Sequence, residues 1–345
     1  MKKSVQELIE IVRKSDDISY RREALIELGY RKEESIYPIL IEQLEDPSNS
    51  IKHAAVISLG RYGNPAAIEE LVKPKVFQSK VENIRWAVVS AIGKLGDYHV
   101  IEHLVKAVGD SQWIVRNQAV TEIKSKIVEI IKLKDNRIVR ILIRLLAMED
   151  DEIVDLAVDG LSEMGEKGYD RILEAVKSPS ARMRANAARV LGKMRAVPAV
   201  DMLIGLLHDP EWQVRRYVVE ALGLIKDKRA IEPLVLRLAD NVERVQRQTV
   251  QSLVIFGKLA TEPLLNALVH EKNKFVLRAL LRTLGEIGDL KAVPALISHL
   301  RSSYFVVRIA AVHALVKYGP QIIDDLLPIL SFNESNIQSL LKVSN

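Results

Sequence analysis

The sequence predicts an all-α, right-handed α-α superhelical solenoid made of about ten helical repeats. Three observations lead to this fold class. An apolar residue followed by a residue that is Arg or Lys in most copies recurs about every 31 residues along almost the whole chain. Apolar side chains between these points follow helical spacing. Aromatic residues make up only 5% of the chain, which is less than a large β-rich core usually uses.

The stretch His208–Leu238 shows how one repeat is built. Asp209 and Pro210 favour the start of a helix, because Asp accepts hydrogen bonds from exposed backbone N–H groups and Pro fits the first turn. A polar turn at 226–229 separates this helix from a second one. Neither helix buries its apolar stripe without neighbouring copies. The two stripes consist of Val214, Val218, Val219 and Leu222, and then of Ile231, Leu234, Val235 and Leu238.

Alignment of the copies on Arg215 defines an anchor position in each repeat. Successive anchors lie 30 to 33 residues apart, except for one step of 38 residues between Arg116 and Val154. Glycines eight and eleven positions after the anchor, such as Gly223 and Gly288, are predicted to end helices, because glycine readily adopts the left-handed conformation. The anchors are Arg21, Lys52, Arg85, Arg116, Val154, Arg184, Arg215, Gln246, Leu277 and Arg308.

We expect residues 1–345 to form a single continuous solenoid, because no Pro-, Gly- or Ser-rich linker interrupts the chain. Residues 1–16 are predicted to form an amphipathic N-terminal cap helix. The repeats are expected to occupy about 17–330, and a C-terminal cap 331–345. The long step between anchors predicts an irregular insertion near 124–137, as either a lengthened helix or an inserted loop.

Several classes of protein are disfavoured by what the sequence lacks. It contains no Cys, which excludes disulfides and cysteine nucleophiles and suits a cytoplasmic protein. No apolar run approaches the roughly 20 residues of a transmembrane helix, so no membrane insertion is expected. Phosphate-binding loops and common hydrolase motifs are missing. His99 and His103 share a predicted helix face, but exposed or half-buried histidines explain them better than a metal site. We therefore predict no catalytic residue, cofactor or metal.

The pattern DP-x-x-x-VR-x-x-x-x-x-A-LG, which begins at Asp209, resembles the HEAT-like repeats of the phycobilisome-lyase type over about residues 15–330. The resemblance implies a HEAT-repeat solenoid in which an Asp and the Arg six positions later form a ladder between neighbouring units. Both members are kept in Asp110/Arg116 and Asp209/Arg215, whereas Ser178/Arg184 and Asp240/Gln246 each lose one, so we expect an interrupted ladder.

The same resemblance raises two enzyme hypotheses, because the group includes deoxyhypusine hydroxylases and bilin lyase subunits as well as scaffolds. A deoxyhypusine hydroxylase-like protein needs His-Glu pairs in several repeats, and His270-Glu271 is the only such dipeptide here. A bilin-lyase-like or cofactor-attachment helper would hold a tetrapyrrole on its concave surface. The aromatic candidates are Trp86, Trp113, Trp212 and Tyr217, although Trp113 and Trp212 are also expected to pack between repeats.

HEAT solenoids usually line their concave side with one row of helices, here predicted to be the row that carries the anchors. Positions one and five after the anchor share an outward stripe, because they lie four residues apart. In the sixth to ninth repeats these positions are mostly Arg, and residues 177–300 contain 20 basic and 12 acidic residues. The candidate binding residues are Arg189, Arg216, Tyr217, Arg247, Arg278 and Arg282, together with Trp86 in an earlier repeat.

A basic concave face predicts a non-catalytic scaffold or adaptor that binds an acidic protein partner. Two alternatives stay open: a bilin-lyase-like or cofactor-attachment helper, and a protein that binds the nucleic-acid backbone through its basic C-terminal groove. Base stacking would need interleaved aromatics, and only Tyr217 is well placed. In the simplest alternative the arginines are solvated and pair with neighbours such as Glu220 and Glu243.

Overall fold

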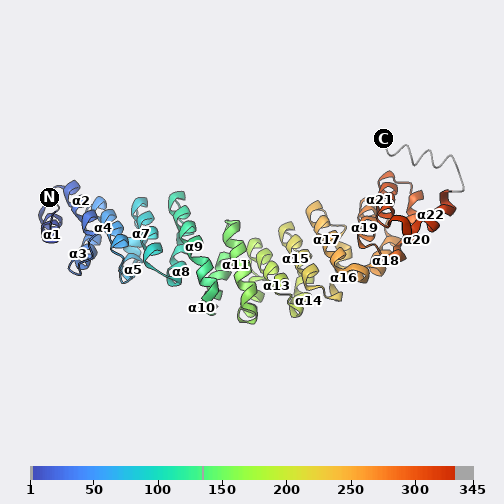
Figure 1. Cartoon of the computed structure of the whole chain (residues 1–345), viewed down its shortest axis with the longest axis horizontal. Helices are drawn as coiled ribbons and strands as arrows, with labels where there is room; N and C mark the ends of the chain where they lie inside the picture. The colour runs from blue at the N-terminus through green and yellow to red at the C-terminus, as the bar shows by residue number, and fades with distance from the viewer. Residues whose placement is uncertain (1–2, 134–135, 331–345) are drawn as a thin grey trace. The chain divides into compact units, whose positions relative to one another are not determined.

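The computed structural model describes residues 3–133 and 136–330, and every regular element within them is helical (Figure 1). The predicted all-α solenoid is confirmed as the fold class. In the described chain, ten long helices carry the anchor positions: α2 (Ile18–Leu28), α4 (Asn49–Tyr62), α7 (Glu82–Leu95), α9 (Trp113–Leu133), α11 (Asp151–Met164), α13 (Ala181–Lys193), α15 (Trp212–Ile225), α17 (Glu243–Phe256), α19 (Lys274–Ile287) and α21 (Phe305–Val316).

Shorter helices alternate with the long ones. They are α3 (Ile36–Glu42), α5 (Ala67–Leu71), α6 (Pro74–Phe77), α8 (Ile101–Val108), α10 (Asn136–Leu145), α12 (Tyr169–Ala175), α14 (Val200–Leu206), α16 (Ile231–Arg237), α18 (Thr261–His270), α20 (Val293–Ser298) and α22 (Ile323–Leu330). The predicted N-terminal cap helix is present as α1 (Val5–Lys14). Its first turn is closed by reciprocal hydrogen bonds between the Ser4 and Glu7 side chains and backbone N–H groups.

The chain divides into two compact units, Met1–Lys167 and Gly168–Asn345. Within each unit the long helices stand side by side in one row and the shorter helices form another (Figure 1). One continuous solenoid over both units stays a prediction. The predicted C-terminal cap at 331–345 lies outside the described residues.

The long helices pack through the apolar stripe that their spacing predicts. In α15 the side chains of Val214, Val218 and Leu222 are completely buried. Asp209 has a different place from the predicted one: it accepts a hydrogen bond of 2.9 Å from the N–H of Glu211 and so stabilises the turn before α15. The helix itself begins three residues before its anchor, as the other long helices do.

Of the glycines eight positions after the anchor, Gly29 ends its helix, α2, as predicted, but Gly60, Gly93, Gly192, Gly223 and Gly285 lie inside theirs, contrary to the prediction. Gly192 lies inside α13, where a Cβ atom would be 2.6 Å from the Cα of Ala221 on α15. A Cβ at Gly223 would be 2.7 Å from the Oγ of Ser252 on α17. Carbon atoms in contact normally stay about 3.5–4.0 Å apart. These glycines therefore let neighbouring long helices approach more closely than a side chain would permit.

The long helices turn instead at the position eleven after the anchor. Gly63 and Gly288 adopt left-handed φ angles of +83° and +69° there, as predicted. Lys226 and Arg195 occupy the same position with φ angles of +60° and +52°. Because two non-glycine residues also adopt this strained conformation, the repeat geometry determines the turn and glycine only makes it easier.

The Asp–Arg ladder exists, but the ion pairs join different residues from those predicted. The Arg215 guanidinium donates two hydrogen bonds, of 2.8 and 3.0 Å, to the Asp240 carboxylate in the next repeat. Within its own repeat, Arg215 donates to the backbone carbonyl of Asp209, at 2.8 Å, and not to the carboxylate. Each such arginine ties the start of its own helix to the following repeat. The same two-bond contact joins Arg85 to Asp110 and Arg184 to Asp209.

This pairing corrects the predicted interruptions of the ladder. Ser178 does not break the contact of Arg184, because the acid partner of Arg184 lies 25 residues ahead at Asp209. Asp240 likewise keeps its base although Gln246 follows it, since its partner is Arg215. The base of each ladder ion pair therefore comes from one repeat and the acid from the next, 25 residues further along the chain.

The insertion near 124–137 is a lengthened helix, one of the two predicted forms. Helix α9 has 21 residues, and it continues past Ile127, the position at which the other long helices turn. Residues 134–135 lie outside the described chain. Another apolar stretch, Glu243–His270, has the length and hydropathy of a membrane span. It consists of two helices, α17 and α18, separated by a 3-10 turn that begins at Gly257 with φ +62°.

Candidate partner-binding groove

Three successive long helices of the second unit, α17, α19 and α21, line a groove of about 530 Å³. This volume falls within the roughly 300–1,000 Å³ that is usual for ligand-binding clefts. We name it the second-unit groove. Its charged lining residues are Glu243, Arg247, Arg278, Arg282, Glu286 and Lys317.

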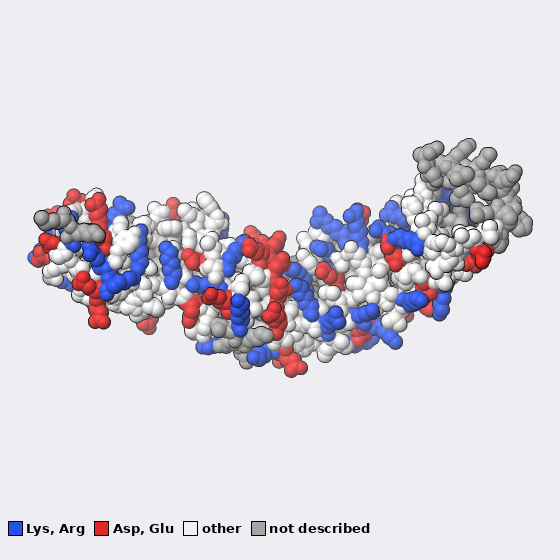
Figure 2. Space-filling view, in the orientation of Figure 1, with Lys and Arg blue, Asp and Glu red and all other residues white. Residues whose placement is uncertain are grey.

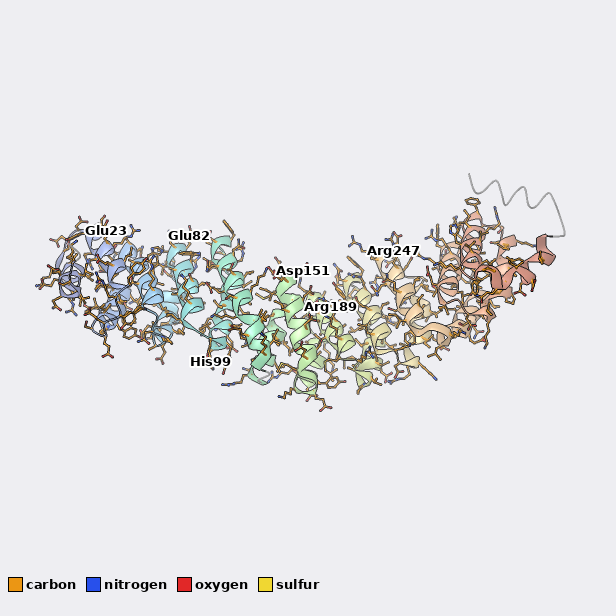
Figure 3. The ribbon with its side chains drawn as sticks, viewed as in Figure 1. Glu23, Glu82, His99, Asp151, Arg189 and Arg247 are labelled. Atoms are coloured by element: carbon orange, nitrogen blue, oxygen red, sulfur yellow. The ribbon has the colours of Figure 1, made fainter. Side chains whose placement is uncertain are left out.

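The repeat places these cations on one surface. Arg247 and Arg278 each follow their anchor by one position and Arg282 follows by five, so they occupy the same stripe on adjacent helices. Packed helices lie about 8–10 Å apart, which brings the three side chains to one groove. Lys and Arg side chains gather along this part of the second unit (Figure 2), and Arg247 is seen on α17 in Figure 3.

Two of the cations are neutralised inside the groove. Arg247 donates a hydrogen bond of 2.7 Å to the Glu243 carboxylate, and this hydrogen bond lowers the pKa of Glu243. Lys317 forms an ion pair with Glu286. Both pairs are substantially exposed, and exposed pairs contribute little to stability.

Arg278 and Arg282 differ from these two cations. Neither donates a hydrogen bond to a residue in the described part of the chain or forms an ion pair there. The Arg278 guanidinium stands over the Phe275 ring, 5.8 Å from its centre, and its positive charge adds to the effect of Arg247 in lowering the pKa of Glu243. Both arginines are exposed and lie one turn apart on α19. The groove therefore offers two exposed guanidinium groups that form no ion pair within the described chain.

The remaining lining of the groove is largely apolar. Val250 and Ala310 are each 8% exposed, so they close the bottom of the groove, and Ile309 is half-buried beside them. An apolar surface next to unpaired guanidinium groups accommodates a ligand with both apolar and anionic groups. The apolar lining residues are Val250, Ala279, Val306, Ile309, Ala310 and Ala314.

The other predicted binding residues lie outside the lining of this groove. The guanidinium groups of Arg189 on α13 and Arg216 on α15 stand 5.0 and 4.8 Å from the centre of the Tyr217 ring and form a separate cation–π cluster. Arg189 is labelled in Figure 3, in the same row of long helices as Arg247. Trp86 is half-buried on α7, in the first unit. A partner-binding role for these residues stays a prediction.

Sequence reasoning missed part of the groove. Glu286 and Lys317 both follow their anchors by nine positions, one helical turn beyond position five. A further step of four residues along the same stripe would have found them. Ile309 and His313 occupy positions one and five on α21 and also line the groove. Neither side chain carries the permanent positive charge by which the sequence identifies the basic stripe.

The other singled-out aromatics and histidines do not form a common surface. Trp113 is 63% exposed, so it does not pack between repeats as expected, whereas Trp212 is half-buried with the Arg244 guanidinium 5.2 Å from its ring centre. His99 lies in a 3-10 turn before α8, not on the same helix as His103. Among the residues that the structure describes, no three His, Asp or Glu side chains are grouped as metal ligands.

Comparison with known proteins places these features in context. The sequence profile of a family described as HEAT repeats matches residues 5–73, 169–254 and 261–335. The narrower phycobilisome-lyase type is not confirmed by this match. Comparison with curated proteins finds no significant match.

Solved structures of Kap121p share the fold. Kap121p itself has 16% sequence identity and a TM-score of 0.54, over 99% of this chain and 45% of Kap121p. Kap121p bound to Nup53p has 18% identity and a TM-score of 0.54, over 94% of this chain and 43% of the other. The chain thus spans less than half of the length of Kap121p. At this identity the likeness shows a helical solenoid and nothing more specific.

Proposed function

Because the chain belongs to the HEAT-repeat family, we propose that it is a non-catalytic adaptor that binds an acidic segment of a partner protein in the second-unit groove. The observation that carries this proposal is the pair Arg278 and Arg282, which form no ion pair within the described chain and stand beside an apolar surface. Unpaired guanidinium groups attract carboxylates and bind them with two parallel hydrogen bonds. The lack of Cys suits action in the cytoplasm.

The fold supports a protein partner in general terms. Kap121p has been solved in complexes with Nup53p, Ste12p and Pho4p, so a solenoid of this kind binds other proteins. Stacked helical repeats offer an extended surface for such partners. The acidic character of the partner proposed here rests on the groove alone and not on Kap121p.

We place the groove on the concave side of the second unit for a packing reason. Gly192, Gly223 and Gly285 let α13 and α15, α15 and α17, and α19 and α21 approach at nearly backbone distance, whereas α17 carries Val254 at the equivalent position. A stack of units curves toward the side on which its members are most closely spaced. The row of long helices, which lines the groove, therefore belongs on the inner side of the curve.

The two alternatives receive less support. A nucleic-acid backbone would face Glu243 and Glu286 as well as the cations, and the Tyr217 ring already has the guanidinium groups of Arg189 and Arg216 within 5.0 Å of its centre. A tetrapyrrole surface would require aromatics that gather, but in the described part of the chain none of Trp86, Trp113, Trp212 and Tyr217 forms an aromatic ring pair. Titration with labelled DNA at two salt concentrations tests the first alternative, since backbone binding weakens steeply with salt. A change in the absorption of an added linear tetrapyrrole would favour the second.

A paired substitution tests the proposal. Arg247→Glu with Arg278→Glu reverses two groove charges, and Arg301→Glu reverses an exposed arginine of the same unit that does not line the groove. Circular dichroism should show unchanged helix content for both proteins. Partners captured from the native host should be retained by wild type and Arg301→Glu and lost from the double variant. Equal retention by all three proteins would show that the groove is not the binding site.

A further inference from the structure

We infer that the second-unit groove selects acidic segments that also carry apolar side chains, and not polyanions in general. This inference rests on the proposed function and specifies the chemistry of the partner. It follows from the length of the groove, the order of its charges and its apolar surface.

The groove is long enough for a short segment of chain. Its lining runs from Glu243, three positions before an anchor, to Lys317, nine positions after one. Equivalent helices of a solenoid run parallel, so these twelve positions correspond to roughly 18 Å at 1.5 Å per residue. An extended peptide rises about 3.3 Å per residue, and about five or six residues therefore fill the groove.

The charges favour a limited number of carboxylates. Glu243 and Glu286 occupy opposite ends of the lining in the helical register, where they already neutralise Arg247 and Lys317. Arg278 and Arg282, between those ends, form no ion pair within the described chain and can accept a carboxylate of a ligand, although the charge of Arg278 also attracts Glu243. A uniformly charged strand of phosphates would place negative charge against both glutamates, and like charges at close range repel. One or two carboxylates near the middle of the segment avoid this repulsion.

The apolar surface supplies the second element of recognition. Val250, Ile309 and Ala310 line the groove from two different helices, α17 and α21, on either side of the arginines of α19. An apolar ligand side chain placed there removes apolar area from water on both surfaces. A segment without apolar side chains leaves this surface exposed and binds through charge alone.

A series of labelled peptides tests this selectivity by fluorescence anisotropy with the full chain. The first peptide contains one Ser-Leu-Glu-Asp-Leu-Ser block, the second has Ser for each Leu, and the third has Gln and Asn for the two acids. Oligothymidylate serves as the polyanion. We expect the first peptide to bind at least about tenfold more tightly than each of the others, because burial of a leucine and pairing of a carboxylate each add to the affinity.

Variants assign the two contributions. Arg278→Glu with Arg282→Glu should weaken binding of the first peptide at least about tenfold, whereas Arg301→Glu should leave it unchanged. Ile309→Ser should weaken binding of the first peptide but not of the second, and Val269→Ser, an exposed apolar residue of α18 outside the groove, is its control. As the salt concentration is raised toward about 1 M, where the Debye length is ~3 Å, oligothymidylate should dissociate at a lower salt concentration than the first peptide.

The possible failures are distinguishable. If the first two peptides bind equally tightly and Ile309→Ser has no effect, selection of apolar side chains is refuted while the acidic-partner proposal survives. Tighter binding of oligothymidylate than of the first peptide also refutes it. If neither acidic peptide binds, or if Arg278→Glu with Arg282→Glu has no effect, the proposed function fails together with the inference.

Discussion

Replacement of Gly192 by alanine tests how closely the long helices pack. The added Cβ would lie 2.6 Å from the Cα of Ala221, about 1 Å closer than ordinary carbon contacts. Forcing α13 and α15 apart should cost about 1–3 kcal/mol, as overpacking of a tight interface does. Alanine is favoured over glycine in a helix by about 0.5–1 kcal/mol. We therefore expect a net loss of up to about 2.5 kcal/mol in the free energy of unfolding.

Gly205→Ala is the matched control. Gly205 lies one residue before the end of α14, as Gly192 does in α13, but a Cβ there would meet nothing within 4 Å. The control should therefore gain about 0.5–1 kcal/mol from helix propensity alone. Thermal unfolding measures the difference, since 1 kcal/mol shifts the Tm of a unit of this size by about 2–4 °C. The close-packing interpretation is refuted if both variants raise the Tm equally.

Three further predictions concern the ladder and the helix ends. Arg215→Met should lower the free energy of unfolding by about 1–3 kcal/mol in urea titrations, because the buried carboxylate of Asp240 loses two hydrogen bonds and keeps, within the described chain, only the Val242 N–H and a 3.8 Å contact with Arg237; an unchanged free energy of unfolding would contradict this. The hydrogen bond from Arg85 lowers the pKa of Asp110, so the pair stabilises the fold above the unfolded pKa of about 3.9, and that stability is lost as the pH falls through the lowered pKa. Asp110→Asn should accordingly reduce the difference in stability between pH 6 and pH 3, and an unchanged difference would exclude this role. Lys226→Gly should raise the Tm slightly, because it relieves a left-handed φ of +60°; a lower Tm would mean that the lysine side chain stabilises the turn.

The periodicity of the sequence predicts the fold well because it depends on local rules. Each anchor, from Arg21 to Arg308, lies three residues inside a long helix, and the buried stripe of α15 follows the predicted spacing. These features follow from helical geometry and the need to bury apolar side chains. They do not depend on where the neighbouring repeat lies.

The misassigned features depend on contacts between repeats. Gly192 was expected to end a helix because glycine is common at helix ends, whereas its role comes from Ala221 on the next long helix. Arg215 was paired with an acid of its own repeat, yet the carboxylate that it reaches is Asp240, 25 residues ahead. A single sequence shows spacing along the chain but not which copy supplies the neighbouring atom.

The candidate groove was predicted in part for the same reason. The stripe of positions one and five identifies Arg247, Arg278 and Arg282, which line one groove. It does not indicate that Lys317 and Glu286 form an ion pair at one end of the groove, or that Tyr217 lies outside the groove lining. Those features depend on side-chain conformations across three helices, which spacing alone does not specify.

The proposed binding site is tested most directly by arginine-selective dicarbonyl modification of the full chain, with and without its captured partner, followed by mass spectrometry. Arg278 and Arg282 are exposed and form no ion pair within the described chain, so they should react readily without the partner. Arg301, exposed on the same unit but outside the groove, is the internal control. Binding in the second-unit groove predicts that the partner protects Arg278 and Arg282 and leaves the modification of Arg301 unchanged. Equal modification of Arg278 and Arg282 with and without the partner would contradict it.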